Sequence, residues 1–269
     1  MRLRIARSKW DMDDLPLDRF LATIAAAGFG ASDIHIPSLR ESPGETAALH
    51  ARHGVALVAM ITSEGTTPAE HRASLAGRFE AAARCGPVHI NCHSGRDTFS
   101  RDENLAVLRE ALALGGRFGI PVSHETHRGR ATYSAPATRE LLLAMPELRL
   151  TADFSHWCCV HESLLADQGE AVSLAIERTD YIHARVGHIE GPQVSDPRAP
   201  EWSAELEAHM GWWRRIAGAR RAAGAEELIV CPEFGPAPYM PLLPYSRTPV
   251  ANLWEITLYM KDILAKNLG

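Results

Sequence analysis

Eight short apolar segments, each followed by a segment with helical periodicity, extend along the whole chain. Strand patterns that alternate with helical patterns indicate βαβ units and a parallel sheet. The predicted strands are Leu3–Ala6, Asp33–Ile36, Val55–Ile61, Val88–Cys92, Pro121–Glu125, Arg149–Phe154, Tyr181–Val186 and Leu228–Pro232. The predicted helices cover about Leu17–Ala27, Gly44–His53, Pro68–Arg84, Asp102–Phe118, Ala135–Met145, a part of Glu162–Arg178, Ala204–Ala223 and Val250–Lys266.

Eight such units in 269 residues are typical of a TIM barrel. The alternative is an open doubly wound sheet, which usually has fewer strands and a glycine-rich first turn. The first turn here is Arg7-Ser8-Lys9-Trp10, which contains no glycine. The sequence therefore predicts an α/β fold, a single-domain (β/α)8 TIM barrel that spans residues 1–269.

Composition excludes several functional classes. The net charge of −5 lacks the basic footprint of a nucleic-acid binder. Apolar runs are too short for a membrane span, and the N-terminus has no signal-peptide core. The five cysteines form no CxxC pair, which indicates reduced thiols and a cytoplasmic protein. We therefore expect no nucleic-acid or membrane partner.

The strand Tyr181–Val186 has one apolar and one polar face. Ile182, Ala184 and Val186 share one side, whereas Tyr181, His183 and Arg185 share the other, because alternate side chains of a strand point in opposite directions. A buried imidazole and guanidinium need partners of opposite type or a metal. This strand therefore predicts that carboxylates lie nearby.

Carboxylates stand at equivalent strand ends. Glu125, Asp153 and Glu233 have the same inward parity as His183, at the end of the barrel where active sites of this fold lie. Carboxylate and imidazole ligands suit Mn, Zn, Co or Mg, and open positions would remain for substrate oxygens. The alternative is a set of buried ion pairs, for example between Arg185 and Glu125 or Glu233.

Four strand-end motifs resemble the xylose isomerase-like TIM-barrel superfamily, which includes sugar and sugar-phosphate isomerases and epimerases as well as endonuclease IV. The motifs are Ser123-His124-Glu125-Thr126-His127, Asp153-Phe154-Ser155-His156, His183-Ala184-Arg185 and Pro232-Glu233-Phe234-Gly235. The resemblance covers nearly the whole chain. It implies Glu125, Asp153, His183 and Glu233 as ligands of one divalent metal, with Glu125 and Glu233 as catalytic acid and base.

The implied activity is that of a divalent-metal-dependent sugar isomerase or epimerase acting through an enediolate on a sugar or polyol. A sugar or inosose dehydratase of the same chemistry is one alternative. Another is an endonuclease IV-like hydrolase, although that family needs a histidine where Thr62 to Glu64 stand and an Asp-x-His after the seventh strand, which is missing. A third is a metal-free sugar-binding barrel.

Further residues are candidates for substrate binding. By resemblance His156 and Arg185 match substrate-polarising positions, with an ion pair as the alternative for Arg185. By their placement after strands, we expect His93, His188 and Trp157 to contact substrate, and Trp10 is a further stacking candidate. The weaker candidates are His35, Glu64 and His127.

The remaining expectations concern histidines and loops. His124 has helix-facing parity and is expected to be structural, whereas the histidines in helical stretches are expected at the surface, namely His50, His53, His71 and His209. The loops Gly187–Gln193 and Phe234–Met240 are expected to form the pocket walls. Their prolines and aromatics fit an oligomer interface equally well, so a homo-oligomer is an alternative expectation.

Overall fold

The computed structural model describes residues 1–269 as one closed barrel of eight parallel strands, which confirms the predicted fold. Neighbouring strands pair in sequence order, and β8 returns to pair with β1. The strands are β1 (Arg2–Ser8), β2 (Ala31–His35), β3 (Ala56–Thr62), β4 (His89–His93), β5 (Val122–Glu125), β6 (Leu150–Ala152), β7 (Thr179–His183) and β8 (Glu227–Cys231).

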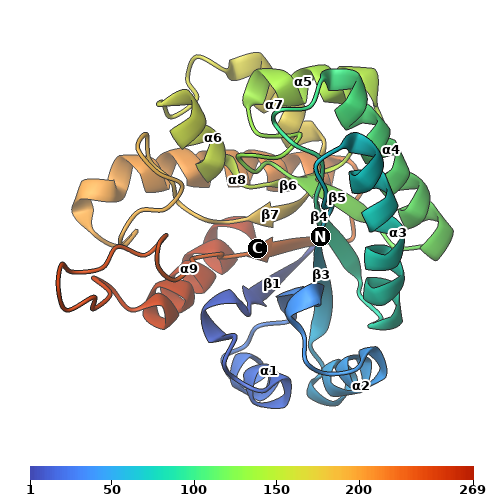
Figure 1. Ribbon diagram of the computed structural model, residues 1–269. Helices are drawn as coiled ribbons and strands as arrows, with labels where there is room; N and C mark the ends of the chain where they lie inside the picture. The colour runs from blue at the N-terminus through green and yellow to red at the C-terminus, as the bar shows by residue number, and fades with distance from the viewer.

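Helices surround the barrel (Figure 1). They are α1 (Leu17–Ala26), α2 (Pro43–His53), α3 (Pro68–Arg84), α4 (Arg101–Phe118), α5 (Ala135–Ala144), α6 (Phe154–His161), α7 (Gly169–Glu177), α8 (Ser203–Ala222) and α9 (Leu253–Leu268). Short 3-10 turns cover Trp10–Met12, Ile36–Ser38 and Pro200–Trp202. Thr67 and Ser100 begin α3 and α4 with capping boxes that satisfy otherwise unpaired backbone N–H groups.

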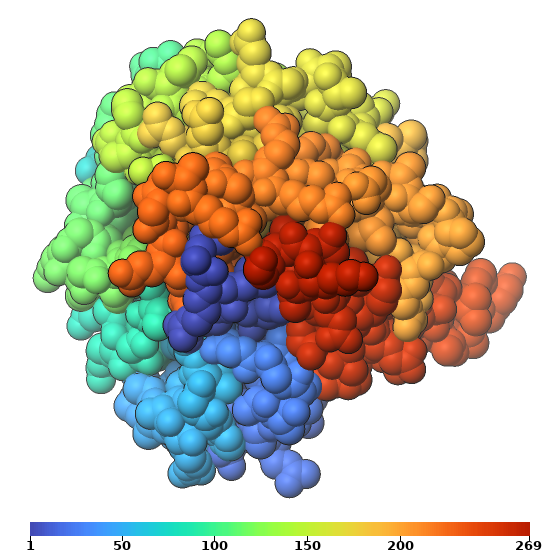
Figure 2. Space-filling view, turned by 180° about the vertical axis from the view of Figure 1, so that it is seen from behind, coloured from blue at the N-terminus to red at the C-terminus, as the bar shows by residue number.

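The barrel closes where the two ends of the chain meet. Leu3 pairs with Leu228 and Ile5 with Val230 in parallel register. Seen from behind, the N-terminal segment lies at the centre of the molecule with the C-terminal helix beside it (Figure 2). Closure leaves no edge strand and brings the ends of β5 to β8 to one rim of the barrel.

Alternating side chains of the strands separate two apolar layers. Leu228 and Val230 point outward and belong to the large core between the barrel and the helices. Ile229 and Cys231 point inward and pack with Tyr181 in the barrel interior. The period-two pattern therefore predicts correctly which side chains face inward.

The sixth unit differs from the predicted one. The expected strand Arg149–Phe154 is shortened to Leu150–Ala152, and α6 begins directly after it. Asp153 is the N-cap of this helix and accepts a hydrogen bond from the Ser155 backbone N–H at 3.2 Å. The Asp-x-x-His motif consequently lies on the first turn of a helix.

The expected surface position of the helical histidines is wrong for His50, His71 and His209, which are all buried. Each has polar partners that satisfy a neutral imidazole. His50 Nε2 lies 2.8 Å from Ser32 Oγ, and His209 Nε2 accepts the Gly187 N–H at 3.2 Å. His53 is half-buried beside Asp18.

All five cysteines are free. None of the helices combines the length and the apolar character needed to cross a membrane.

Candidate active site

Glu125, Asp153, His183 and Glu233 come together at one end of the barrel. Glu125 and His183 end β5 and β7, Asp153 caps α6 and Glu233 follows β8. All four are buried, and each offers a ligand atom within 4.8 Å of the others. Three carboxylates and one imidazole are thus enclosed away from water, which favours a cation among them.

The His183 ring is the centre of this group. Its Nδ1 lies 3.3 Å from Glu125 Oε2 and 3.1 Å from Glu233 Oε2, yet it makes no hydrogen bond. Its Nε2 lies 3.1 Å from Asp33 Oδ2, which also accepts the Tyr181 hydroxyl at 2.6 Å. An Nε2–H donated to Asp33 leaves the Nδ1 lone pair facing two carboxylates.

With Nε2–H donated to Asp33, an unprotonated Nδ1 completes a set of three carboxylates and one imidazole that fits a divalent cation. Metal-ligating histidines commonly donate their second ring N–H to a carboxylate, as His183 does to Asp33. Burial alone would lower the pKa of His183, but the charges of Glu233 and Glu125 raise that pKa well above its ordinary value. Either a proton on His183 or a metal ion must therefore offset the negative charge of Glu125 and Glu233.

Of the two ion pairs named as the alternative, the one between Arg185 and Glu233 is present, whereas Arg185 forms none with Glu125. The Arg185 guanidinium pairs with Asp153 and lies 3.4 Å from Glu233 Oε2, and its Nε donates to Ser155 Oγ at 3.2 Å. Burial raises the pKa of Asp153 to about 6 although Arg185 opposes the rise. Arg185 thus forms ion pairs with Asp153 and Glu233, whereas the Nδ1 of His183 faces Glu125 and Glu233.

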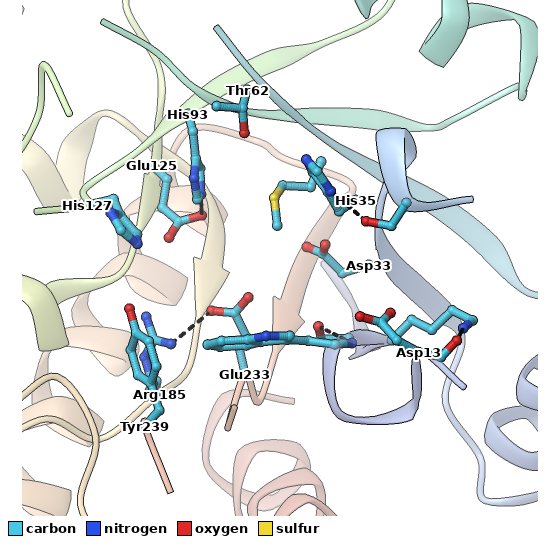
Figure 3. Close-up of a pocket in the computed structure, with 15 residues that line it drawn as sticks. Asp13, Asp33, His35, Thr62, His93, Glu125, His127, Arg185, Glu233 and Tyr239 are labelled. Atoms are coloured by element: carbon cyan, nitrogen blue, oxygen red, sulfur yellow. Dashed lines mark hydrogen bonds and ion pairs between the residues drawn. The ribbon is translucent and has the colours of Figure 1, made fainter. Parts of the chain in front are cut away.

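A cavity of about 340 Å³ opens beside this cluster (Figure 3). Its walls are polar and come from all parts of the barrel mouth. They comprise Ser8, Lys9, Trp10, Asp13, Asp33, His35, Ser38, Met60, Thr62, His93, Glu125, His127, Arg185, Glu233 and Tyr239. Glu125 and Glu233 face each other from opposite walls, so a ligand could be approached from two sides.

Hydrogen bonds fix the Glu125 carboxylate from the β4 side. Its Oε2 accepts the Asn91 amide at 2.7 Å and lies 2.7 Å from His93 Nε2. Burial raises the pKa of Glu125, but the positive charges of His93 and His183 outweigh burial and hold it well below its usual range. Glu125 is therefore ionised and able to accept a proton.

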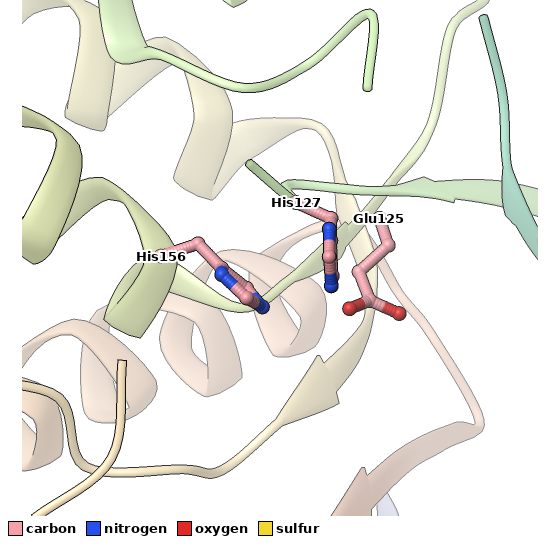
Figure 4. Close-up of side chains that lie close together, drawn as sticks. All are labelled: Glu125, His127 and His156. Atoms are coloured by element: carbon pink, nitrogen blue, oxygen red, sulfur yellow. The ribbon is translucent and has the colours of Figure 1, made fainter. Parts of the chain in front are cut away.

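His127 has both of the roles that its position suggested. It lines the cavity, and its Nδ1 lies 2.6 Å from the Arg128 carbonyl oxygen. The centroids of the His127 and His156 rings lie 3.9 Å apart with the rings tilted by 46°, and both rings lie beside Glu125 (Figure 4). His156 is fully buried, does not line the cavity, and meets Arg185 Nη2 with its Nε2 at 2.7 Å. It is placed to position Arg185.

Besides His156, two further residues predicted to bind substrate lie outside the cavity wall. Trp157 is fully buried, stacks on Phe154 at 4.8 Å and donates its indole N–H to the Thr132 carbonyl. It belongs to the core because α6 carries it away from the cavity. His188 lies against Trp202 and outside the cavity wall, because the loop after β7 turns back at Gly191.

Some of the remaining candidate residues line the cavity and others lie outside it. His93, His35 and Trp10 line the cavity, whereas Glu64 is exposed and pairs with Arg78 at 2.6 Å. His124 is buried with Nδ1 2.7 Å from Ser94 Oγ, consistent with a structural role.

Sequence reasoning missed Asp33 and Asn91, and it included Tyr239 only as part of a loop expected to form the pocket wall. Asp33 and Asn91 lie on inward faces of β2 and β4, so strand parity could have found them. Tyr239 lies in the loop after β8, where no periodic signal exists, and its ring packs 4.9 Å from the Arg185 guanidinium. Trp10 meets the Tyr239 ring edge-on at 4.9 Å.

The two predicted wall loops are joined by a clamp. The Gln193 amide accepts the Gly235 N–H at 2.7 Å and donates to the Gly235 carbonyl at 3.1 Å. Gly235 lies flat on Trp10, where an added Cβ would come within 2.2 Å of the indole. The clamp thus fixes the position of Trp10 in the cavity wall.

No protein-family model and no functionally curated sequence matches the chain. Solved structures match over its whole length. D-Psicose 3-epimerase, crystallised in the presence of D-fructose, is 12% identical with a TM-score of 0.66, covering 99% of both chains. 3-Keto-D-glucoside 4-epimerase from E. coli is 13% identical, with a TM-score of 0.61, and covers 98% of this chain and 100% of its own.

Endonuclease IV from Thermus thermophilus is 16% identical with a TM-score of 0.58, covering 100% of this chain and 99% of its own. At such identities these matches show the fold alone. They confirm the (β/α)8 barrel fold that the sequence predicts, over the whole length of the chain.

Proposed function

We propose that this chain is a divalent-metal-dependent sugar isomerase or epimerase that acts through an enediolate. The observation that carries the proposal is the His183 Nδ1, buried without a hydrogen bond between Glu125 and Glu233 while Asp33 holds the opposite ring nitrogen. A metal-free site would have to keep His183 protonated to occupy the space between the two carboxylates. The metal-free sugar-binding barrel is therefore the weaker interpretation.

The residues that would hold the metal are Glu125, Asp153, His183 and Glu233. When bound, Mn, Zn, Co or Mg would supply Lewis-acid stabilisation of the negative charge that develops on a substrate carbonyl. The protein's own part is to place the donors, with Asp33 orienting His183 and Arg185 orienting Asp153. Arg185 also lines the cavity, where it can bind a substrate oxygen.

Glu125 and Glu233 are the proposed proton carriers. Burial raises the pKa of Glu233, but the charges of His183 and Arg185 outweigh it and lower the pKa, so both carboxylates are ionised at neutral pH. They face each other across the cavity (Figure 3). One carboxylate can return a proton to the same face of an enediolate, whereas two on opposite faces allow inversion at carbon. Epimerisation therefore ranks at least level with isomerisation.

Phosphodiester hydrolysis is the weaker alternative. Thr62 lines the cavity where an endonuclease IV-like site would need a histidine. The cavity wall includes Asp13, Asp33, Glu125 and Glu233 against the cations Lys9 and Arg185, so a DNA backbone would meet excess negative charge.

The test combines metal analysis with isotope exchange. The purified protein should retain about one divalent ion per chain, and incubation in D₂O with ketoses, keto-inositols and keto-glycosides should place deuterium at one carbon of a turned-over substrate. Deuterium entry that stops on chelation and returns with Mn²⁺ supports the proposal. A protein that holds no metal after exposure to Mn²⁺, Zn²⁺, Co²⁺ and Mg²⁺ contradicts it.

A further inference from the structure

The cavity extends well beyond the proposed proton carriers. Figure 3 shows Arg185 at one end and Asp13 at the other, with Glu233 between them. The end beside Asp13 is formed by the β1–α1 and β2–α2 connections, which contribute Lys9, Asp13, His35 and Ser38. None of these residues is hydrogen-bonded to the four proposed metal ligands, so this end has no part in the mechanism described so far.

A second cavity of about 210 Å³ adjoins this end. It shares Lys9, Asp13 and Ser38 with the first cavity and is lined by further residues of the β1–α1 and β2–α2 connections. Its other walls are Asp14, Leu15, Pro16, Ile34, Leu39, Arg40 and Glu41. The space beside the proton carriers is thus followed by a separate compartment with its own polar and apolar groups.

Lys9 stands at the junction of the two cavities. The residue is only 8% exposed, and its ammonium donates to the carbonyls of Met12 at 3.1 Å and Asp13 at 3.0 Å. It forms no ion pair with a carboxylate. An ammonium has three N–H donors, so one is left for a ligand at this junction.

The charges around Lys9 select against an anion. Asp13, Asp14 and Glu41 outnumber the cations Lys9 and Arg40 in the second cavity, so a phosphate or carboxylate would face three carboxylates. Hydroxyl groups could accept from Lys9 and donate to these acids. The apolar side chains of the same wall suit the C–H face of a sugar ring.

We propose that the second cavity and the Lys9 junction form a glycosyl-binding subsite, so that the preferred substrate is a sugar bearing a neutral glycosyl substituent. The reacting sugar would lie beside Glu125 and Glu233, and the substituent beside Lys9 and Asp14. This inference rests on the proposed function for the reacting half and adds the substrate class.

Calorimetric titration of the Mn²⁺-treated protein tests the subsite. The probes are D-fructose and two disaccharides that carry glucose on different fructose oxygens, turanose and isomaltulose. At least one disaccharide should bind tenfold or more tightly than fructose. Asp14→Trp, at an exposed position that lines only the second cavity, should abolish this advantage and leave fructose binding within twofold. Ala22→Trp, on the exposed face of α1, should change neither.

Equal affinities for fructose and both disaccharides would overturn the subsite, as would a disaccharide advantage that survives Asp14→Trp. The proposed function fails separately. In that case the disaccharide advantage and its loss in Asp14→Trp are observed, but no deuterium enters any of the three sugars from D₂O.

Discussion

Asp33 and His183 are separated by 150 residues in sequence, yet Asp33 Oδ2 lies 3.1 Å from the Nε2 of His183 inside the barrel. The same oxygen accepts the Tyr181 hydroxyl. One buried carboxylate therefore determines which nitrogen of His183 is left free to face Glu125 and Glu233.

The first prediction concerns this carboxylate. Asp33→Asn should weaken Mn²⁺ or Co²⁺ affinity by about 10- to 100-fold, because the ring loses the negatively charged acceptor that orients it and raises its basicity. Tyr181→Phe removes only the neighbouring hydroxyl and should have a smaller effect. Calorimetry and the visible spectrum of the Co²⁺ form report the affinity and the ligand geometry. Unchanged metal affinity in Asp33→Asn would show that this contact does not position His183.

The second prediction concerns Asp153. Asp153→Ala should lose bound metal and activity together, since the variant removes one of three carboxylates from the site. Thermal unfolding should also shift downward, because Arg185 is left buried without its main partner. Asp180→Ala, which removes a partly buried partner of Arg220 outside the site, is the matched control and should keep its metal. Full metal content in Asp153→Ala would contradict the ligand assignment.

The third prediction separates proton transfer from metal binding. Glu125→Gln and Glu233→Gln each keep an oxygen that can face the metal but remove the base. Isotope exchange from D₂O should fall by about 10²–10⁴, while part of the metal remains. Undiminished exchange in both single variants would mean that neither glutamate moves the proton, and His156 would then be the next residue to test.

The fourth prediction concerns acid stability. Burial lowers the pKa of His89 to about 4 and that of His209 to about 4, compared with 6.5 for an ordinary histidine. Between these values the unfolded chain binds more protons than the folded one. The free energy of unfolding is therefore largest above about pH 6.5 and falls towards pH 4, with a slope of about 1.4 kcal/mol per pH unit for each ring.

Urea unfolding at a series of pH values measures this slope. His209→Gln should reduce it by about one ring's share, even if the variant is less stable at pH 7. An unchanged slope in His209→Gln would show that this imidazole does not remain neutral in the folded protein.

The fifth prediction concerns the wall beside Trp10. Gly235→Ala places a methyl group where the indole lies, so Trp10 must move. We expect KM for a turned-over sugar to rise by about tenfold or more with a smaller change in kcat, together with altered tryptophan fluorescence. Gly211→Ala, on α8 with no atom within 4 Å of the added Cβ, is the control. Unchanged KM would exclude Trp10 from substrate binding.

Strand parity predicted the barrel and the convergence of Glu125, His183 and Glu233, because period-two alternation fixes the direction of each side chain. It failed where a strand ended early. Asp153 begins α6, and the helical rotation turns Trp157 into the core. Strand parity also did not identify Asp33 as a site residue. It predicts that Asp33 lies on the inward face of β2, but it does not predict that the His183 ring lies across the barrel from it. Tyr239 depends on loop packing that has no sequence period.

The Gln193 clamp on Gly235 has a consequence for how substrate preference can evolve in this protein. The loops after β7 and β8 share one pair of hydrogen bonds, and Trp10 from the loop after β1 rests on the clamped glycine. A mutation that reshapes any one of these three loops alone would displace the other two. New specificities should therefore arise through concerted changes in all three loops.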